Sequence, residues 1–142
     1  MKLRIISKSG RVPKYETAGS AGFDISAFLD TPMVLAPGER KLVPTGLFFE
    51  VEPGYEAQVR ARSGLAIKKG IGLVNGIGTI DSDYRGEVRV VLLNHSQQIQ
   101  TIAPGERVAQ LIITPVLTPA YEKVEELTDT TRGSGGFGST GK

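Results

Sequence analysis

The sequence of 142 residues contains no cysteine, no tryptophan and a single histidine, His95. Without cysteine the chain can form no disulfide, no thiolate nucleophile and no zinc site built on cysteine. A histidine metal site or a serine–histidine triad would depend on His95 alone, and this residue follows a predicted strand, where we expect it at the surface.

Long apolar runs and a strong net charge are also missing. The best apolar stretch, residues 90–93, is far shorter than a membrane span, and the apolar part of residues 1–8 is too short for a signal peptide. The 17 basic and 15 acidic residues give a net charge of only +2. We therefore expect a cytoplasmic protein of one domain, with neither a membrane nor a nucleic acid as its partner.

Glycine and proline are abundant, with 18 and 8 residues, and they divide the chain into short segments rich in β-branched and aromatic residues. Residues 55–62 alternate apolar and polar side chains, as in a half-buried strand. The composition predicts an all-β fold, a jelly-roll-like sandwich or barrel with one short helix. The predicted strands are residues 3–6, 23–28, 46–51, 55–62, 87–94, 98–102 and 108–114.

The connections follow a repeated turn pattern. Ala-Pro-Gly-Glu-Arg occurs at residues 36–40 and 103–107, and Pro-Gly suits the centre of a type II turn. Ser63 is predicted to cap a helix over residues 64–69 that Gly70 ends. Residues 118–127 fit a helix or a strand that crosses to a neighbouring molecule, and the sequence leaves both open.

The densest polar cluster is residues 78–87, which we expect in a hairpin between two strands. Asp81 and Asp83 offer carboxylates for general-base chemistry, and Tyr84 offers a flat surface for a sugar. The same composition is common in ordinary turns. The bulky Ile80 and Tyr84 favour a site, because a solvated turn seldom contains such side chains.

Several other polar residues are candidates for binding. Arg62, Ser63 and Gly64 begin the predicted helix, where free N–H groups suit a phosphate, although a simple cap explains them equally well. Asn75 stands in a glycine-rich stretch. Gln110 and Asp24 interrupt apolar segments, so each must find a polar partner or face outward.

The last eleven residues form a glycine-rich segment from Arg132 to Lys142, with Phe137 as its only aromatic residue. The segment can bury too little apolar surface to offset the conformational entropy lost when it becomes ordered. We therefore expect a flexible arm at residues 132–142 and a core of residues 1–131. An arginine and a phenylalanine among glycines suit an arm that orders over a nucleotide. A disordered terminus has the same composition.

Five segments together resemble the five ordered motifs of the homotrimeric dUTP pyrophosphatases, the dUTPases, and the resemblance covers essentially the whole chain. A departure is Ala61, where many members have proline before the arginine of the second motif. The five segments are residues 21–25, 62–66, 78–87, 105–111 and 132–141.

The resemblance implies hydrolysis of dUTP to dUMP and pyrophosphate, which keeps uracil out of DNA and supplies dUMP for thymidylate synthesis. It implies Mg²⁺ held by the triphosphate, a homotrimer with shared sites, Asp81 as general base, Gln110 beside the attacking water, and Asp24 as a supporting residue rather than a direct metal ligand. The implied substrate-binding residues are Arg62, Ser63, Gly64, Asn75, Thr79, Ile80, Asp81, Tyr84, Arg89, Arg132, Phe137, Gly138 and Ser139.

Two other functions share this fold. A dCTP deaminase-like enzyme would need a glutamate base and residues that handle the amine, and the tyrosine of residues 78–87 and the arm match dUTPases better. A non-catalytic nucleotide-dependent regulator would keep the fold and signal through its bound state. The presence of Asp81 and Gln110 argues against a loss of catalysis.

Overall fold

The computed structural model describes residues 2–138, which form ten strands and one short helix. Every strand pair is antiparallel, and the all-β prediction is confirmed. The elements are β1 (Arg4–Ser7), β2 (Phe23–Ser26), β3 (Met33–Leu35), β4 (Arg40–Glu50), β5 (Tyr55–Arg60), α1 (Ser63–Lys69), β6 (Ile71–Leu73), β7 (Ile77–Ile80), β8 (Glu87–Asn94), β9 (Gln100–Ile102) and β10 (Arg107–Pro115).

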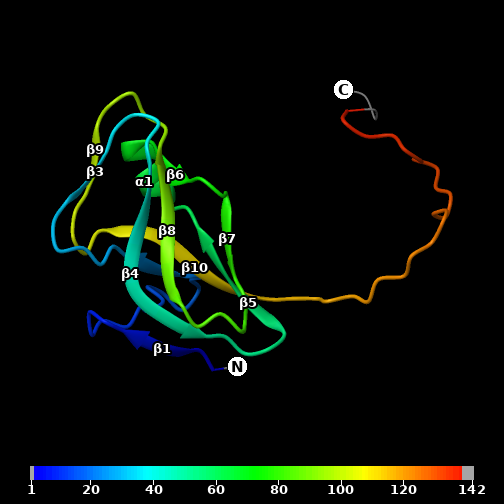
Figure 1. The fold of residues 1–142 in the computed structure, drawn as a ribbon, viewed down its shortest axis with the longest axis horizontal. Coiled ribbons are helices and arrows are strands. Elements are labelled where there is room, and N and C mark those ends of the chain that lie inside the picture. Colours follow the sequence, from blue (N-terminus) through cyan, green and yellow to red (C-terminus); the bar gives the residue numbers. More distant parts are fainter. Residues whose placement is uncertain (1, 139–142) are drawn as a thin grey trace.

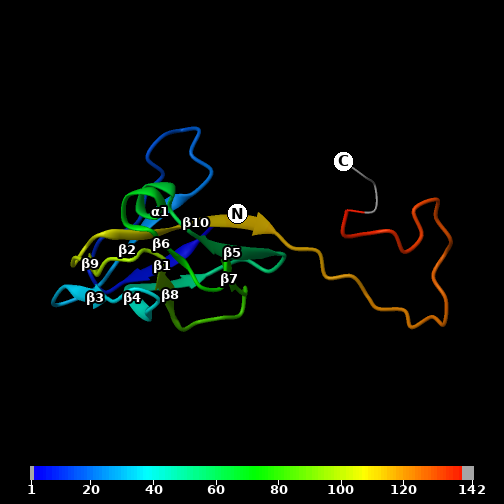
Figure 2. The same cartoon turned by 90° about the horizontal axis from the view of Figure 1, so that it is seen from above.

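Two four-stranded sheets form the body, with the strand orders β1-β4-β8-β6 and β2-β10-β5-β7, and β3 pairs with β9 in a small third sheet. Figure 1 and Figure 2 show the two larger sheets as layers, with α1 on the outer side of the second. Side chains alternate between buried and accessible along β5 and β8, as predicted for half-buried strands. The inward residues of both sheets, among them Ile25, Val90 and Leu111, share one core.

The predicted Pro-Gly turns are confirmed. Gly38 and Gly105 have φ of 73° and 76°, the left-handed conformation that the third residue of a type II turn requires. In each turn the N–H of the following glutamate donates to the alanine carbonyl three residues earlier, at 3.0 Å.

Two local predictions are wrong. The cap of α1 is not Ser63, which is the first helical residue; Arg62 occupies the cap position with extended backbone, and no side chain caps the helix. Residues 78–87 do not form a hairpin, because β7 and β8 belong to different sheets. Strands β3, β6 and β7 and the first half of β4 were not predicted, since they are short, glycine-rich or interrupted by Pro44.

After β10 the chain leaves the body. Residues 116–138 contain neither helix nor strand, and the tail runs away from both sheets (Figure 1). Residues 118–127 are therefore not a helix in this chain, and a strand that crosses to a neighbouring molecule stays a prediction. The boundary between core and arm at residue 131 stays a prediction. No helix in the described part of the chain is long and apolar enough to span a membrane.

Candidate functional site

A cavity of about 560 Å³ lies between β7 and β8. It brings together five of the predicted site residues from the two strands and the segment that joins them. Leu42 of β4, Gly86 and Glu87 complete its wall. The five predicted residues are Thr79, Ile80, Asp81, Tyr84 and Arg89.

The two strands present open edges to this cavity. β7 is the last strand of its sheet, and β8 pairs with β4 throughout but with β6 only from Leu92 onward. Within residues 2–138 no other strand pairs with the free edge of β7 or with residues 87–90 on the side away from β4. Unpaired backbone N–H and C=O groups at a strand edge can recognise a flat ring by its donors and acceptors.

Tyr84 is held in a fixed orientation beside this cavity. Its hydroxyl donates to the Glu87 carbonyl at 3.1 Å, and its backbone N–H donates to the Asp81 carbonyl at 3.2 Å. A Cβ atom on Gly86 would lie 2.2 Å from the Tyr84 hydroxyl oxygen, so only glycine fits beneath the ring. The phenol therefore forms a rigid, half-exposed wall.

Asp81 is exposed at the end of β7, between this cavity and a smaller one of about 260 Å³. The smaller cavity is also lined by Val116 and Thr118, where the tail leaves the body. The Asp81 carboxylate is thus accessible to solvent and to a ligand, as a general base must be.

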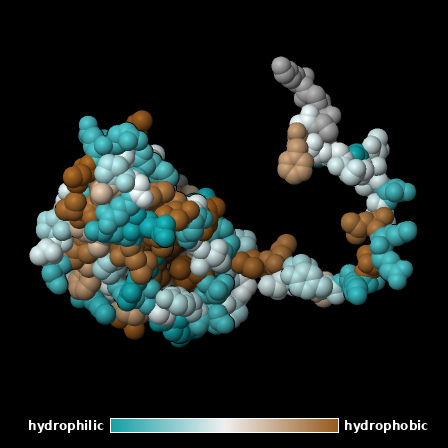
Figure 3. Space-filling view, turned by 45° about the horizontal axis from the view of Figure 1, so that its top comes forward, coloured by the Kyte–Doolittle hydropathy of each residue, from teal (hydrophilic) through white to brown (hydrophobic). Residues whose placement is uncertain are grey.

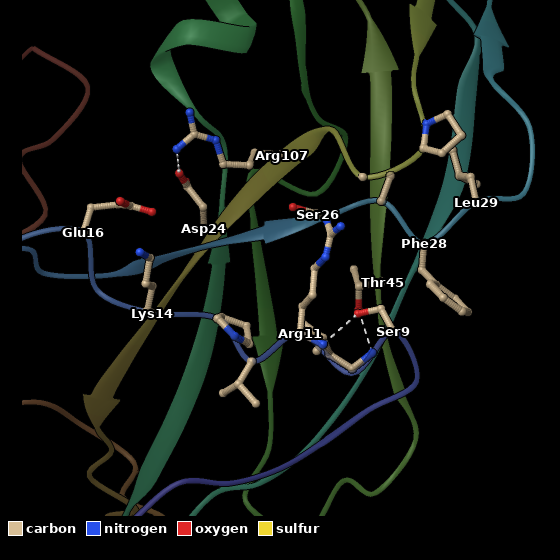
Figure 4. A pocket seen from close by; sticks show the side chains of 16 residues that line it. Ser9, Arg11, Lys14, Glu16, Asp24, Ser26, Phe28, Leu29, Thr45 and Arg107 are labelled. Atoms are coloured by element: carbon tan, nitrogen blue, oxygen red, sulfur yellow. Dashed lines mark hydrogen bonds and ion pairs between the residues drawn. The ribbon is translucent and has the colours of Figure 1, made fainter.

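A second cluster surrounds the start of α1. Asp24 accepts from the Arg62 Nε atom at 2.7 Å and from an Arg107 Nη atom at 2.9 Å. Figure 4 shows the pair of Asp24 and Arg107 at the edge of another cavity, of about 500 Å³, toward which Arg11 and Lys14 also point. Both Asp24 oxygens are occupied by arginines, which agrees with a supporting role.

Gln110 belongs to this second cluster. Its side-chain amide donates to the Ala61 carbonyl at 2.9 Å, directly before Arg62, so the polar partner that the sequence required is present. Ser63 is exposed, and Gly64 follows it in the first turn of α1. The first turn contains no acidic side chain, so nothing there repels an anion.

The two clusters do not meet within one chain. Ile80, just before Asp81, pairs with Ala57 of β5, whereas Gln110 pairs with Arg60. By strand geometry, Asp81 and Gln110 are about 13 Å apart along the strands and roughly 10 Å apart across them. Their side chains cannot contact one water molecule.

The remaining predicted residues lie apart from both clusters. Asn75 is exposed at the opposite end of β7 from Asp81. Arg132 donates to the Gly135 carbonyl at 2.7 Å, and Phe137 is fully exposed, with Gly138 beside it. Ser139 lies outside the described residues.

Two residues that the sequence reasoning did not single out belong to these clusters. Arg107 shares Asp24 with Arg62, and Glu87 borders the cavity between β7 and β8. Arg107 lies in the segment 105–111 and Glu87 in the segment 78–87, two of the five segments that resemble dUTPase motifs. Membership of these segments was the sequence signal that could have identified both residues. No three histidine, cysteine or acidic side chains of residues 2–138 come together as a metal site.

Comparison with known proteins gives one consistent result. A family model described as dUTPase matches residues 8–141. The deoxyuridine 5'-triphosphate nucleotidohydrolase of Anaeromyxobacter sp. (strain Fw109-5) is 56% identical over 100% of this chain and 97% of its own length. That of Nautilia profundicola is 52% identical over 100% and 99%. A solved structure of the Staphylococcus bacteriophage 80alpha dUTPase with dUpNHpp is 27% identical, with a TM-score of 0.84 over 99% of both chains.

Proposed function

This chain belongs to the dUTPase family and hydrolyses dUTP, and we propose that water attacks the α-phosphorus and releases dUMP and pyrophosphate. The observation that supports this best is the cavity between β7 and β8, where two open strand edges, a fixed tyrosine and an accessible aspartate surround a space of about 560 Å³. In the cell the reaction would keep uracil out of DNA and supply dUMP, and we place it in the cytoplasm.

Asp81 is proposed to orient the attacking water and take its proton. A carboxylate suits this step because arginines offset the charge of the phosphates and positioning supplies much of the rate. Gln110 helps to hold the water or an oxygen of the α-phosphate. Arg62, Ser63 and Gly64 bind the phosphate chain at the start of α1.

The nucleoside is proposed to lie between β7 and β8. Backbone groups of Thr79 to Asp81 and near Arg89, together with the Asn75 amide, read the uracil edge, and cytosine is rejected because its donor pattern is reversed at the 4-position. The close strands leave no space for the methyl group of thymine. Tyr84 packs on the deoxyribose where a 2′-hydroxyl would stand.

Mg²⁺ is proposed to enter with the substrate, bound to the triphosphate oxygens. The described residues offer no group of three ligands, and both Asp24 oxygens are taken by arginines. Mg²⁺ commonly binds substrate phosphates and keeps several waters, so the triphosphate can hold it. When bound, it offsets the negative charge of the triphosphate.

The active unit is proposed to be a homotrimer in which each site takes residues from more than one copy. The separation of Asp81 from Gln110 within one chain supports this, because both are needed at one water molecule. The body also exposes large apolar side chains, and the tail carries more of them (Figure 3). Such surface is typical of contacts with another copy.

The arm is proposed to close over the site of another copy. Phe137 would cover the uracil, Arg132 would bind the γ-phosphate, and Gly138 and Ser139 would donate backbone N–H groups to the phosphates. The fully exposed Phe137 ring, which contacts nothing in the body that would hold it there, suits an arm awaiting its ligand.

Incubation with each dNTP and Mg²⁺, followed by separate measurement of pyrophosphate and ammonia, tests the activity. We expect pyrophosphate from dUTP alone and no ammonia from any nucleotide. Ammonia from dCTP would show a deaminase instead, and binding of dUTP without either product would indicate a regulator.

The role of Tyr84 predicts a change in sugar selectivity. Tyr84→Ala opens space beside the 2′-carbon and is expected to lower the ratio of kcat/KM for dUTP to that for UTP by on the order of tenfold to a hundredfold. Tyr84→Phe keeps the ring and is expected to retain most of the selectivity. An unchanged ratio in the alanine variant would remove Tyr84 from the sugar pocket.

A further inference from the structure

Glu87 is the first residue of β8 and borders the cavity assigned to the nucleoside, yet the proposed mechanism gives it no part. Its side chain is 11% exposed, which is low for a glutamate. A carboxylate that is so far removed from water needs strong hydrogen-bond partners.

Glu87 joins two residues of the cavity wall, Tyr84 and Arg89, to Gly46 of β4, which lies outside that wall. Its Oε1 atom accepts from the Gly46 N–H of β4 at 2.8 Å, and its Oε2 atom accepts from Arg89 Nε at 3.0 Å. Its backbone carbonyl accepts from the Tyr84 hydroxyl at 3.1 Å. One residue therefore joins β4, the Arg89 guanidinium and the Tyr84 ring.

The contact with Gly46 falls on an irregular part of β4. The pairing of β4 with β8 shifts between Pro44 and Leu47, and Gly46 has φ of 66°. A Cβ atom on Gly46 would lie 3.0 Å from the Phe28 ring, so the bulge has little room to move. The Thr45 hydroxyl donates to the carbonyl of Val88, the residue after Glu87. The bulge thus fixes the start of β8 through two neighbouring residues.

The charge of Glu87 supports these contacts. Burial raises the pKa of its carboxyl, but hydrogen bonds from Gly46 and Arg89 and the positive charges of Arg89 and Lys8 outweigh this and leave the pKa below the ordinary value. The side chain is ionised at neutral pH, so both hydrogen bonds are charge-assisted.

We infer that Glu87 is a positioning residue for nucleoside binding: its carboxylate holds the start of β8 and the Arg89 guanidinium against the β4 bulge, so that the cavity wall is preformed before the ligand enters. This inference rests on the proposed function, because it concerns the same cavity. Glu87 touches neither the phosphates nor the attacking water, so its removal weakens binding and leaves the chemical step nearly intact.

Glu87→Gln is the test, because the amide keeps the shape but cannot accept from Gly46 and Arg89 together. We expect KM for dUTP to rise on the order of tenfold with kcat changed less than about twofold, the pattern of lost uniform binding. The Kd of dUMP, measured by calorimetry, is expected to rise by the same factor. Arg89→Gln should raise KM for dUTP and Kd of dUMP by similar factors. The double variant of Glu87→Gln and Arg89→Gln should raise these constants little further than either single variant does.

Glu39→Gln is the matched control. Glu39 also accepts a backbone N–H, from Ala36 at 2.8 Å, and pairs with the basic residue two positions on, Lys41, at 3.3 Å. It lies beside Asn94, the far end of β8, about 23 Å from Glu87 by strand geometry. We expect unchanged KM and Kd in this variant, and thermal unfolding of both variants shows whether they remain folded.

Each outcome decides the inference. The inference would be overturned if KM for dUTP and Kd of dUMP stayed at the wild-type values in Glu87→Gln, because the effect would then be absent. It would also be overturned if both constants rose equally in Glu87→Gln and Glu39→Gln, because the effect would then be only structural. If the wild-type protein bound dUMP but released no pyrophosphate from dUTP, the proposed reaction would fail, while the dUMP Kd values would still decide the role of Glu87. If the wild type released pyrophosphate but bound no dUMP, the proposed reaction would stand, and the KM values for dUTP would decide the role of Glu87.

Discussion

Asp81→Asn is expected to lower kcat for dUTP by about a hundredfold to ten-thousandfold, the usual effect of removing a general base. Asparagine has nearly the shape of aspartate but cannot take a proton from water. Because Asp81 is exposed at the cavity edge and packs against nothing in the core, the variant should fold normally and bind a non-hydrolysable dUTP analogue with nearly the wild-type Kd. Wild-type turnover in this variant would exclude Asp81 as the base.

The separation of the two clusters gives this variant a second use. Gln110→Ala should also be inactive, because it loses the proposed contact with the water or the α-phosphate. Its defect lies in the cluster at the start of α1 and not in the cavity that contains Asp81. If each site combines Asp81 of one copy with Gln110 of another, co-refolding equal amounts of the two variants should restore about a quarter of the wild-type activity through random mixing. No recovery in the co-refolded mixture would contradict a site that combines Asp81 and Gln110 of different copies.

Deletion of residues 132–142 is expected to leave a folded protein whose kcat/KM for dUTP is lower by on the order of a hundredfold, because lid closure positions the substrate and excludes water. The hydrogen bonds found for residues 132–138 are local, such as that from Arg132 to the Gly135 carbonyl. Loss of the arm should therefore leave the unfolding temperature and the oligomeric state unchanged. Full activity of the truncated protein would reduce the arm to a solubilising tail.

Phe137→Trp reports arm closure directly, because the chain has no other tryptophan. Ordering the arm costs entropy, so it should occur only where base and triphosphate both contribute contacts. Fluorescence should be quenched strongly by a non-hydrolysable dUTP analogue and weakly by dUMP. Equal quenching by both ligands would contradict a lid that requires the triphosphate.

The longer strands rich in β-branched residues could be predicted from the sequence, and the shortest ones could not. β8 was predicted at its observed bounds, Glu87–Asn94, because this segment is rich in valine. β6 and β7 are only three and four residues long and each contains a glycine, so no local signal marked them. The sequence also gave no means to tell that β7 and β8 join different sheets, since sheet membership depends on distant partners.

The candidate site shows the same limit. Most residues of the cavity between β7 and β8 are neighbours in the sequence, and residues 78–87 stood out as a candidate site. Leu42 comes from distant β4 and was not predicted, and Arg89 was named only through the resemblance. The contact of Arg107 with Asp24 joins residues 83 positions apart and exists only because β2 pairs with β10. The cap of α1 was predicted wrongly because it also depends on a distant partner. The preference for serine at helix caps takes no account of the contact between Arg62 and Asp24.

If the arm is the proposed lid, the tail that leaves the body at Pro115 also determines how Phe137 meets its target. From Val116 to Phe137 it can span up to about 70 Å when extended, enough to reach the site of a neighbouring copy. Tethering makes closure an intramolecular encounter, with an effective concentration that can reach the millimolar range. A Phe137 contact that would be too weak between separate molecules can then close the site at each turnover. The same weakness lets the lid reopen quickly, so that a tight seal during the reaction need not delay release of the product.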